Sequence, residues 1–427
     1  MKSTVWNLTV LFLLLKLSQV LIVYFVPSQF DTSSEIVIEA HINSKYKLIE
    51  SSRYPNITEY LITNILDKVI RWDAVYFTDL FFNEIKFEHQ FVFCPLYWRM
   101  IKSIPFGENN FYTKLIVSLI VNNISHYLAS LILFALTRTI FKNFTQNEER
   151  LQKLSFYSSA SFIVSQAGIF LTANYAESPC CLLSFISMYL REISLNYRDF
   201  SMVNSKMSLK QYQYKLTYLL SGSFVALNYG FRANALLLGI FYLYDTFEFM
   251  VRNHNLKDSL WLLASGSQLF FSFVWINWLN YEKFCPERGE WCNNMVPSLF
   301  SFAQTHYWNV GFLRYWSSNN IPNFLFALPT IIISLLSFRY FFQINPTRIL
   351  LPYVMVNFSL IILGLLFWHV QILTRVSSFL PLCNWFIASL LISNNQKERS
   401  TGMWIIKYSV VWNLVQTALF AEFLPPA

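Results

Sequence analysis

The sequence predicts an all-α integral membrane protein that crosses the bilayer about eleven times. Of its 427 residues, 55% are hydrophobic and only 13% are charged, whereas soluble domains carry about 25% charged residues. Several uninterrupted apolar runs also approach the roughly 20 residues that a helix needs to cross a hydrocarbon core. Backbone groups in lipid must be satisfied within their own structure, and the alternating pattern of a membrane barrel is absent. These runs therefore predict helices.

The first apolar run, residues 10–26, follows an early lysine and is not followed by a small-x-small cleavage site. This pattern is typical of an uncleaved signal anchor. The chain then leaves the membrane over residues 27–113, where acidic residues outnumber lysine and arginine by eleven to eight. An acidic excess favours the non-cytosolic side. We therefore expect a single membrane domain, 1–427, with a long first loop facing away from the cytosol.

Ten further apolar segments continue the pattern. Clusters of lysine and arginine lie in five of the connections between them, one of which we count from Arg191 to Lys215 with five cations. Such clusters in short loops mark the cytosolic side. All five fall on one side if the segments cross alternately, which places a second long loop, residues 280–323, on the opposite side. This arrangement also accounts for most of the net charge of +8 without any basic run, so no nucleic-acid partner is predicted. The segments are 115–136, 155–173, 177–191, 216–230, 233–250, 260–279, 324–342, 349–368, 376–392 and 404–422.

Five polar stretches fall on the side opposite the cationic loops. Ionisable residues at membrane depth are costly and usually face a cavity or a partner. We therefore expect these stretches to share one cavity. They are "RWDAVYFTDL" (71–80), "EHQFVFCPLYWRM" (88–100), "NYAESP" (174–179), "NYGFRANA" (228–235) and "HVQILTR" (369–375).

The first of these stretches contains two carboxylates, Asp73 and Asp79. Apolar residues at helical spacing precede it, which predicts an amphipathic surface helix that continues through Trp72. Six residues separate the carboxylates, a rotation of about 240° around a helix. Only one of them can then face a site, and we choose Asp73, with Asp79 facing solvent. The alternative role for Asp73 is a buried ion pair with Arg71.

Each of the other stretches offers a site candidate with a structural alternative. Arg375 can hold a phosphate through its planar guanidinium or can reach lipid head groups, and Arg232 has the same two readings. Glu177 can contact substrate or stabilise the start of a helix. The remaining substrate-binding candidates are Trp72, His89, Gln90, His369 and Gln371.

Cys285 and Cys292 form a pair in the second long loop. On the non-cytosolic side a disulfide between them could persist, but two free thiols are an equal alternative.

Six motifs in order along the chain carry a resemblance to a known family. They are "RWDAVYF", "EHQFVFCPL", "NYAESPCCLLSF", "NYGFRANALL", "YWNVGFLRYW" with "IPNF", and "HVQILTR". In order and approximate spacing they resemble the second mannosyltransferases of glycosylphosphatidylinositol (GPI) anchor assembly, across almost the whole chain.

The resemblance implies a polytopic GT-C-type glycosyltransferase in the endoplasmic-reticulum membrane with a lumenal active site. The chain resembles enzymes that transfer mannose from dolichyl phosphate mannose, in α1,6 linkage, to the first mannose of a GPI precursor. Asp73 would act as the general base, and Arg375, with Arg232 as second choice, would bind the leaving phosphate.

The resemblance implies no cofactor, and we expect no metal because the chain has a single acidic WD motif rather than an acidic pair. The implied partners are the lipid-linked donor, the GPI precursor and the membrane, with a small accessory membrane subunit as a further possibility. The alternatives are another GT-C mannosyltransferase that uses dolichyl phosphate mannose, or a membrane transporter or non-catalytic subunit.

Overall fold

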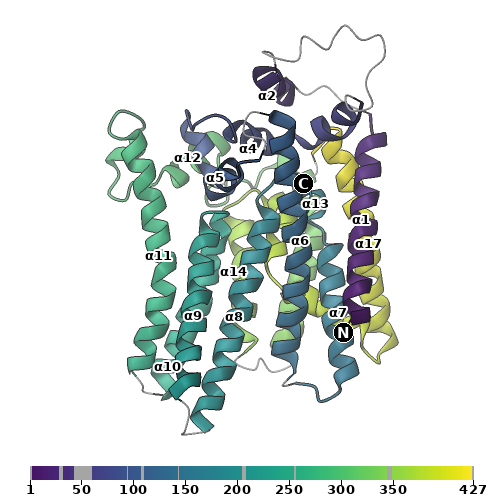
Figure 1. The fold of residues 1–427 in the computed structure, drawn as a ribbon, viewed down its shortest axis with the longest axis vertical. Helices are drawn as coiled ribbons and strands as arrows, with labels where there is room; N and C mark the ends of the chain where they lie inside the picture. Colours follow the sequence, from purple (N-terminus) through teal and green to yellow (C-terminus); the bar gives the residue numbers. More distant parts are fainter. Residues whose placement is uncertain are drawn as a thin grey trace.

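The computed structural model describes residues 2–27, 32–42, 60–93, 95–106, 110–142, 144–203, 208–253, 256–343 and 349–425. Long helices stand side by side through the molecule, and short helices cover one end of the bundle (Figure 1). No strand occurs in the described ranges. Each of the eleven predicted apolar segments overlaps a different helix of the bundle, so the expectation of an all-α membrane protein is confirmed.

The helices of the bundle are α1 (Lys2–Phe25), α6 (Phe111–Phe141), α7 (Glu148–Ile163), α8 (Glu177–Val203), α9 (Ser208–Tyr229), α10 (Gly239–Asn253), α11 (Leu256–Phe284), α13 (Ile321–Gln343), α14 (Leu351–Leu366), α16 (Leu382–Leu391) and α17 (Gln396–Ala421). The short helices are α2 (Thr32–Ile42), α4 (Ala74–Leu80), α5 (Pro95–Ser103), α12 (Leu299–Trp308) and α15 (Leu373–Val376).

Among the described residues, five helical segments are long and apolar enough by themselves to cross a membrane. They are Ser3–Phe25, Phe111–Phe141, Ala233–Val251, Ser259–Phe284 and Ser318–Gln343, and α14 and α16 are shorter apolar helices. The other bundle helices carry polar residues that face neighbouring helices, such as Asn413 of α17, which accepts a hydrogen bond of 2.9 Å from Gln19 of α1. The total of eleven crossings therefore stays a prediction.

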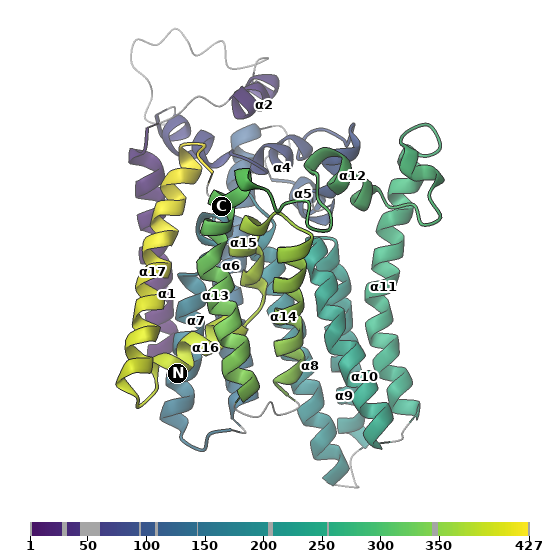
Figure 2. The ribbon, with the colours of Figure 1, turned by 180° about the vertical axis from the view of Figure 1, so that it is seen from behind.

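The two ends of the bundle differ in the helix ends and short helices that they carry. Helices α6, α8, α10, α13 and α16 end, and α7, α9, α11, α14 and α17 begin, at one end, whereas α2, α4, α5 and α12 lie at the other (Figures 1 and 2). The alternation inferred from the cationic loops thus agrees with the direction of the helices. Arg191, which we counted among the loop cations, is an exception because it lies buried inside the bundle.

Two buried lysines fix the first long loop to the ends of helices. The ammonium group of Lys68 donates hydrogen bonds to the carbonyl oxygens of Val23 and Val26, at the end of α1. Lys114, in the first turn of α6, donates in the same way to Ile104, just after α5. The last carbonyl groups of a helix have no partner within the helix, so cations there satisfy them and also stabilise the helix dipole.

The helix expected to continue through Trp72 is broken instead. A π-helical turn, Ile62–Leu66, and a 3-10 turn, Asp67–Val69, end before it, and α4 starts only at Ala74. Trp72 itself has φ of 55°, in the left-handed region, where a residue with a Cβ atom is strained by about 1–2 kcal/mol. Its ring stacks on Phe423, with centroids 4.7 Å apart. This contact supports the break, and the break turns Asp73 away from the preceding helical turns.

The second long loop contains a disulfide between Cys285 and Cys292. The sequence left this pairing and two free thiols equally open. The bond closes the loop directly after α11, and α12 follows it at the same end of the molecule as α4 and α5 (Figure 2).

Candidate functional site

Four charged side chains from four separate segments meet near the end of the bundle that carries the short helices. Arg375 Nη1 donates to Asp73 Oδ2 at 2.8 Å, and its Nε lies 3.7 Å from Glu177 Oε1. Arg232 Nη1 lies 3.0 Å from the same Glu177 oxygen. We call Asp73, Glu177, Arg232 and Arg375 the site cluster. The sequence singled out all four, and the structure brings them together across as many as 302 residues of chain.

Local backbone structure explains how each member reaches the cluster. Asp73 is the residue before α4, directly after the break at Trp72, and its carboxylate does not cap that helix. Glu177 is the first residue of α8, and Arg375 lies in the single turn of α15. Arg232 has an extended backbone in the corner between α9 and α10. The cluster is therefore built from helix ends and corners, where side chains can leave the apolar helix surfaces.

The corner that carries Arg232 is fixed by a tight contact. The backbone amide of Leu96 donates to the carbonyl of Gly230 at 3.0 Å. A Cβ atom at Gly230 would lie 2.3 Å from the Leu96 side chain, so only glycine allows this approach. Leu96 of the "EHQFVFCPL" motif and Gly230 of the "NYGFRANALL" motif thus pack against each other beside the site.

Arg375 is enclosed by aromatic rings as well as by carboxylates. Its guanidinium carbon lies 5.1 Å from the Phe170 ring centroid and 5.7 Å from that of Tyr175. Burial alone would lower the pKa of Arg375, but the carboxylates of Asp73 and Glu177 outweigh it and raise the pKa. A cation so placed keeps its charge and can pair with an anion in a partly dry environment.

Several polar atoms of the site cluster have unused hydrogen-bonding capacity. Within the described part of the chain, neither carboxylate oxygen of Glu177 makes an aligned hydrogen bond, and neither does Nε of Arg375. The Asp73 side chain is 30% exposed, whereas that of Glu177 is 3% exposed. Buried polar groups in proteins are nearly always satisfied, and exceptions call for an explanation. A bound polar ligand would supply one here.

Asp73 takes Arg375 as its ion-pair partner, in place of the Arg71 pairing that the sequence left open. Arg71 donates instead to Ser34 Oγ. Next to them, Trp72 has a buried indole N–H with no partner among the described residues. Trp72 therefore lies beside the cluster with one unused donor.

Asp79 is separate from the site cluster, as the rotation around α4 predicted, but it does not simply face solvent. It accepts a hydrogen bond of 2.7 Å from Asn83 and lies 3.4 Å from a ring nitrogen of His41. Burial alone would raise the pKa of Asp79, but the hydrogen bonds from His41 and Asn83 outweigh it and lower the pKa. Asp79 thus ties α2 to α4.

His369 and Gln371 gather around Tyr315 of the second long loop. The His369 ring stacks on Tyr315 with centroids 4.5 Å apart, and the Gln371 side chain lies close to the Tyr315 hydroxyl. His369 Nε2 lies 2.7 Å from the Trp308 carbonyl oxygen, so this nitrogen carries the proton. Burial, together with the nearby Arg375 charge, lowers the pKa of His369. Its neutral ring therefore connects the second loop to the edge of the site cluster.

His89 and Gln90 differ in how near they come to the site cluster. The His89 ring contacts the edge of Tyr76, whose hydroxyl pKa is raised by burial and by Asp73. Gln90 accepts the backbone amide of Lys86 at 2.8 Å and approaches Asp79 at 3.4 Å. The Tyr76 ring therefore lies between His89 and the site cluster, whereas Gln90 stabilises its own loop. A substrate-binding role for either residue stays a prediction.

Sequence reasoning missed three aromatic residues of the site. Phe170 and Tyr175 form the walls around Arg375, and Tyr315 holds both His369 and Gln371. Tyr175 and Tyr315 lie inside motifs that were already singled out, "NYAESP" and "YWNVGFLRYW", so their position was available as a signal. Phe170 lies in an apolar segment, where no feature of the sequence distinguishes it from its neighbours.

In the described ranges, no group of three or more His, Cys, Asp or Glu side chains is arranged to hold a metal ion.

The chain matches the profile of the family described as Mannosyltransferase (PIG-V) over residues 5–351 and 347–427. It is 42% identical to the GPI mannosyltransferase 2 of Candida albicans over 423 residues, which is 99% of this chain and 100% of that protein. It is 34% identical to the Kluyveromyces lactis protein of the same name, covering 98% of this chain and 97% of that protein.

The Saccharomyces cerevisiae protein of that name is 31% identical, with 99% of both chains covered. No solved structure matches. Both the profile and these relatives extend across essentially the whole chain, including all four residues of the site cluster. The chain therefore belongs to the PIG-V mannosyltransferase family.

Proposed function

We propose that this protein transfers the second mannose of the GPI anchor. In this proposal, a GT-C-type active site takes mannose from dolichyl phosphate mannose and attaches it in α1,6 linkage to the first mannose of the GPI precursor. The observation that carries the proposal is the convergence of Asp73, Glu177, Arg232 and Arg375 in a member of this family. The site cluster combines an accessible carboxylate with two guanidinium groups, which suits transfer of a sugar from a phosphate.

Asp73 is the proposed general base. Its carboxylate takes the proton from the O6 hydroxyl of the acceptor mannose as that oxygen attacks the anomeric carbon of the donor. The bond from this carbon to the phosphate oxygen breaks, and dolichyl phosphate leaves with the bonding electron pair. A positioned base contributes about 10²–10⁴-fold to such a step. Asp73 suits the role better than Glu177 because its side chain is 30% exposed rather than 3%.

Arg375 is the proposed partner of the leaving phosphate, with Arg232 next to it. In the structure, Arg375 donates to Asp73 and lies near Glu177. A phosphate that enters can replace Asp73 on Arg375, because guanidinium groups bind phosphate oxygens in a fork. The exchange releases the Asp73 carboxylate toward the acceptor. Glu177 then stays between the two arginines and holds both guanidinium groups in place.

A lumenal active site in the endoplasmic-reticulum membrane is part of the proposal. The helix ends that flank the five connections rich in lysine and arginine lie at the opposite end from α2, α4, α5 and α12, and cations in such connections mark the cytosolic side. The disulfide between Cys285 and Cys292 lies at the site end of the molecule, and disulfides persist in oxidising compartments. Both observations support the lumenal orientation.

The decisive experiment is transfer by the purified chain in detergent. We expect it to convert a GPI precursor with one mannose into one with two when dolichyl phosphate mannose is the only sugar donor. An α1,6-specific mannosidase should remove the new sugar, and chelation should leave the rate unchanged because we propose no metal cofactor. Use of GDP-mannose instead, or activity that needs added divalent ions, would contradict the donor and metal parts respectively.

Cells depleted of the protein separate this function from its alternatives. We expect them to accumulate a GPI precursor with one mannose. Another GT-C mannosyltransferase would cause a different lipid-linked glycan to accumulate, and a transporter would leave a microsomal transfer assay intact. Activity that needs a second protein would show as transfer in microsomes but not by the purified chain.

A further inference from the structure

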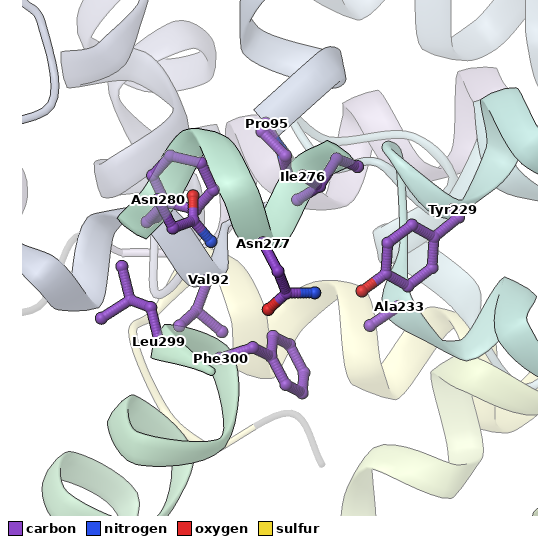
Figure 3. A pocket seen from close by; sticks show the side chains of 10 residues that line it. Val92, Pro95, Tyr229, Ala233, Ile276, Asn277, Asn280, Leu299 and Phe300 are labelled. Carbon is purple, nitrogen blue, oxygen red and sulfur yellow. The ribbon is translucent and has the colours of Figure 1, made fainter. Parts of the chain in front are cut away.

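A pocket outside the site cluster lies between the upper ends of α9 and α11 and the start of α12. Its empty space is about 420 Å³, counting the open mouth. Figure 3 shows Asn277 pointing into the middle of the pocket, between Phe300 on one side and Tyr229 on the other. The proposed chemistry at Asp73 does not use any of these residues.

The pocket carries polar atoms that lack partners. Asn277 donates to the Phe273 carbonyl at 2.8 Å, and its amide lies on the side of the Tyr229 hydroxyl (Figure 3). Its Oδ1 atom is nevertheless buried without a partner among the described residues, and so is Oδ1 of Asn280. Asn280 is only 2% exposed. A buried acceptor left without a donor is unfavourable, because it has given up its hydrogen bond to water without a replacement. A ligand with hydroxyl donors would remove that cost.

The rest of the lining limits the chemistry of such a ligand. None of the ten lining residues is charged, so a phosphate or an ammonium group would find no counter-ion. Apolar and aromatic side chains, among them Val92, Leu299 and Phe300, form the other walls. An apolar wall facing two amide acceptors suits a sugar ring, which combines an apolar C–H face with hydroxyl donors. A hydrocarbon chain would leave both amide oxygens unsatisfied.

Two continuous segments join the pocket to the site cluster. Ala233, in its lining, directly follows Arg232. Val92, also in its lining, precedes Phe93, whose ring stacks on Tyr76 with centroids 4.5 Å apart. Tyr76 in turn lies within electrostatic reach of Asp73. The pocket and the site cluster are therefore neighbouring parts of one region.

We propose that this pocket binds one neutral hexose ring of the acceptor glycan, with Asn277 and Asn280 accepting hydrogen bonds from its hydroxyl groups. The proposal rests on the proposed function, since it assumes a glycolipid acceptor. The donor phosphate belongs at the two arginines, which leaves the uncharged pocket for the acceptor. Tyr229 and Asn277 then act as specificity residues, because an acceptor lacking the matching hydroxyl would leave them unpaired.

The test uses the full chain with Asn277 and Asn280 both replaced by leucine, which removes the amide acceptors at nearly constant volume. We expect the KM for the acceptor glycolipid to rise about 5–100-fold, because both hydrogen bonds to the amide oxygens are lost. The KM for dolichyl phosphate mannose should not change. Binding of the acceptor in the absence of donor should weaken by the same factor.

The matched control is Asn294→Leu, because Asn294 is an exposed amide in the same loop region. It should leave both KM values unchanged. An unchanged acceptor KM in the double variant would overturn the proposal, and so would tighter binding, which would indicate a hydrocarbon chain in the pocket. Val92→Trp fills the pocket without altering an amide. This variant should fold but should not bind the acceptor. Intact acceptor binding by Val92→Trp would also overturn the proposal.

The experiments distinguish a wrong assignment of the pocket from a wrong proposed function. If the unaltered protein transfers mannose and the double variant has an unchanged acceptor KM, only the pocket assignment is wrong. If the unaltered protein transfers no mannose to the GPI precursor, the proposed function is wrong. In that case, the pocket is still supported if the unaltered protein binds a neutral glycolipid and the double variant binds it more weakly. If the unaltered protein binds no neutral glycolipid, the pocket assignment is wrong as well.

Discussion

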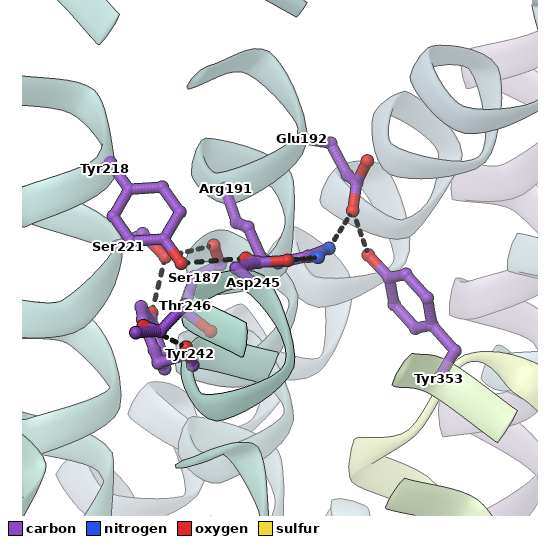
Figure 4. Close-up of polar contacts among 9 residues, drawn as sticks. All are labelled: Ser187, Arg191, Glu192, Tyr218, Ser221, Tyr242, Asp245, Thr246 and Tyr353. Carbon is purple, nitrogen blue, oxygen red and sulfur yellow. Dashed lines mark hydrogen bonds and ion pairs between the residues drawn. The ribbon is translucent and has the colours of Figure 1, made fainter. Parts of the chain in front are cut away.

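The protein contains two charged clusters that use similar residues in opposite ways. The second cluster lies inside the bundle, where Arg191 of α8 donates to Asp245 of α10 at 2.7 Å and pairs with Glu192 (Figure 4). Tyr218 of α9 donates to Asp245 at 2.7 Å, and Tyr353 of α14 donates to Glu192 at 3.0 Å. We call these five residues the interhelix cluster.

The two clusters differ in exposure and in satisfied hydrogen bonds. In the interhelix cluster the charged side chains are 2–5% exposed, and none of their fully buried polar atoms lacks a partner among the described residues. In the site cluster Asp73 is 30% exposed, and Glu177 and Arg375 keep unused hydrogen-bonding atoms. A fully satisfied network rigidifies the helices that contribute to it, whereas a partly satisfied one has capacity for a ligand. Charge at membrane depth therefore does not by itself indicate a site.

The largest effect on activity should come from Asp73→Asn. Loss of the general base should reduce the transfer rate about 10²–10⁴-fold at saturating donor and acceptor. Folding should be retained, because a partly exposed ion pair contributes about 1 kcal/mol or less. The measurement is the initial rate with the purified protein, and the control is Asp79→Asn, which lies outside the cluster. A D73N protein that keeps more than about a tenth of the rate cannot have lost a general base.

The largest effect on stability should come from Arg191→Met. It leaves the Asp245 and Glu192 carboxylates buried without their cation, which destabilises the fold by about 3–5 kcal/mol. Thermal unfolding in detergent should show the loss. A triple variant with Asp245→Leu and Glu192→Gln should recover most of the stability, because no charge then remains buried. Normal stability of R191M alone would refute the structural role of the interhelix cluster.

Tyr353→Phe should have a smaller effect of the same kind. It removes one hydrogen bond to Glu192, and hydrogen bonds to charged groups contribute about 1.5–3 kcal/mol. The KM values for donor and acceptor should not change, since Tyr353 does not touch the site cluster. A change in KM without a change in unfolding temperature would show that the two clusters are coupled.

The smallest effect should come from Arg375→Lys. Lysine keeps the positive charge but loses the guanidinium fork, so we expect the KM for the donor to rise about tenfold, equivalent to about 1.4 kcal/mol. Arg288→Lys, at an exposed position of the second loop, is the matched control. An R375K enzyme with an unchanged donor KM would argue against a phosphate contact at this position.

Sequence patterns predicted the membrane class and the members of the site cluster. Asp73, Glu177, Arg232 and Arg375 stood out because charge is rare in an apolar chain, and the order of the cationic loops placed all four at one end. The same reasoning misassigned Arg191. A cation next to the end of an apolar run gives the same local sequence pattern whether its side chain faces solvent or neighbouring helices. It also missed Phe170, which is one apolar residue among many.

The sequence by itself determined where the long apolar helices form and which of their ends lie together, because hydropathy and charge act within windows of about 20 residues. Only the tertiary structure decided that Asp73 pairs with Arg375 rather than Arg71, that the chain breaks at Trp72, and that Arg191 faces inward. These outcomes depend on contacts between segments far apart in the chain. Such contacts are selected by how whole helix surfaces pack, and no local stretch of sequence contains that information.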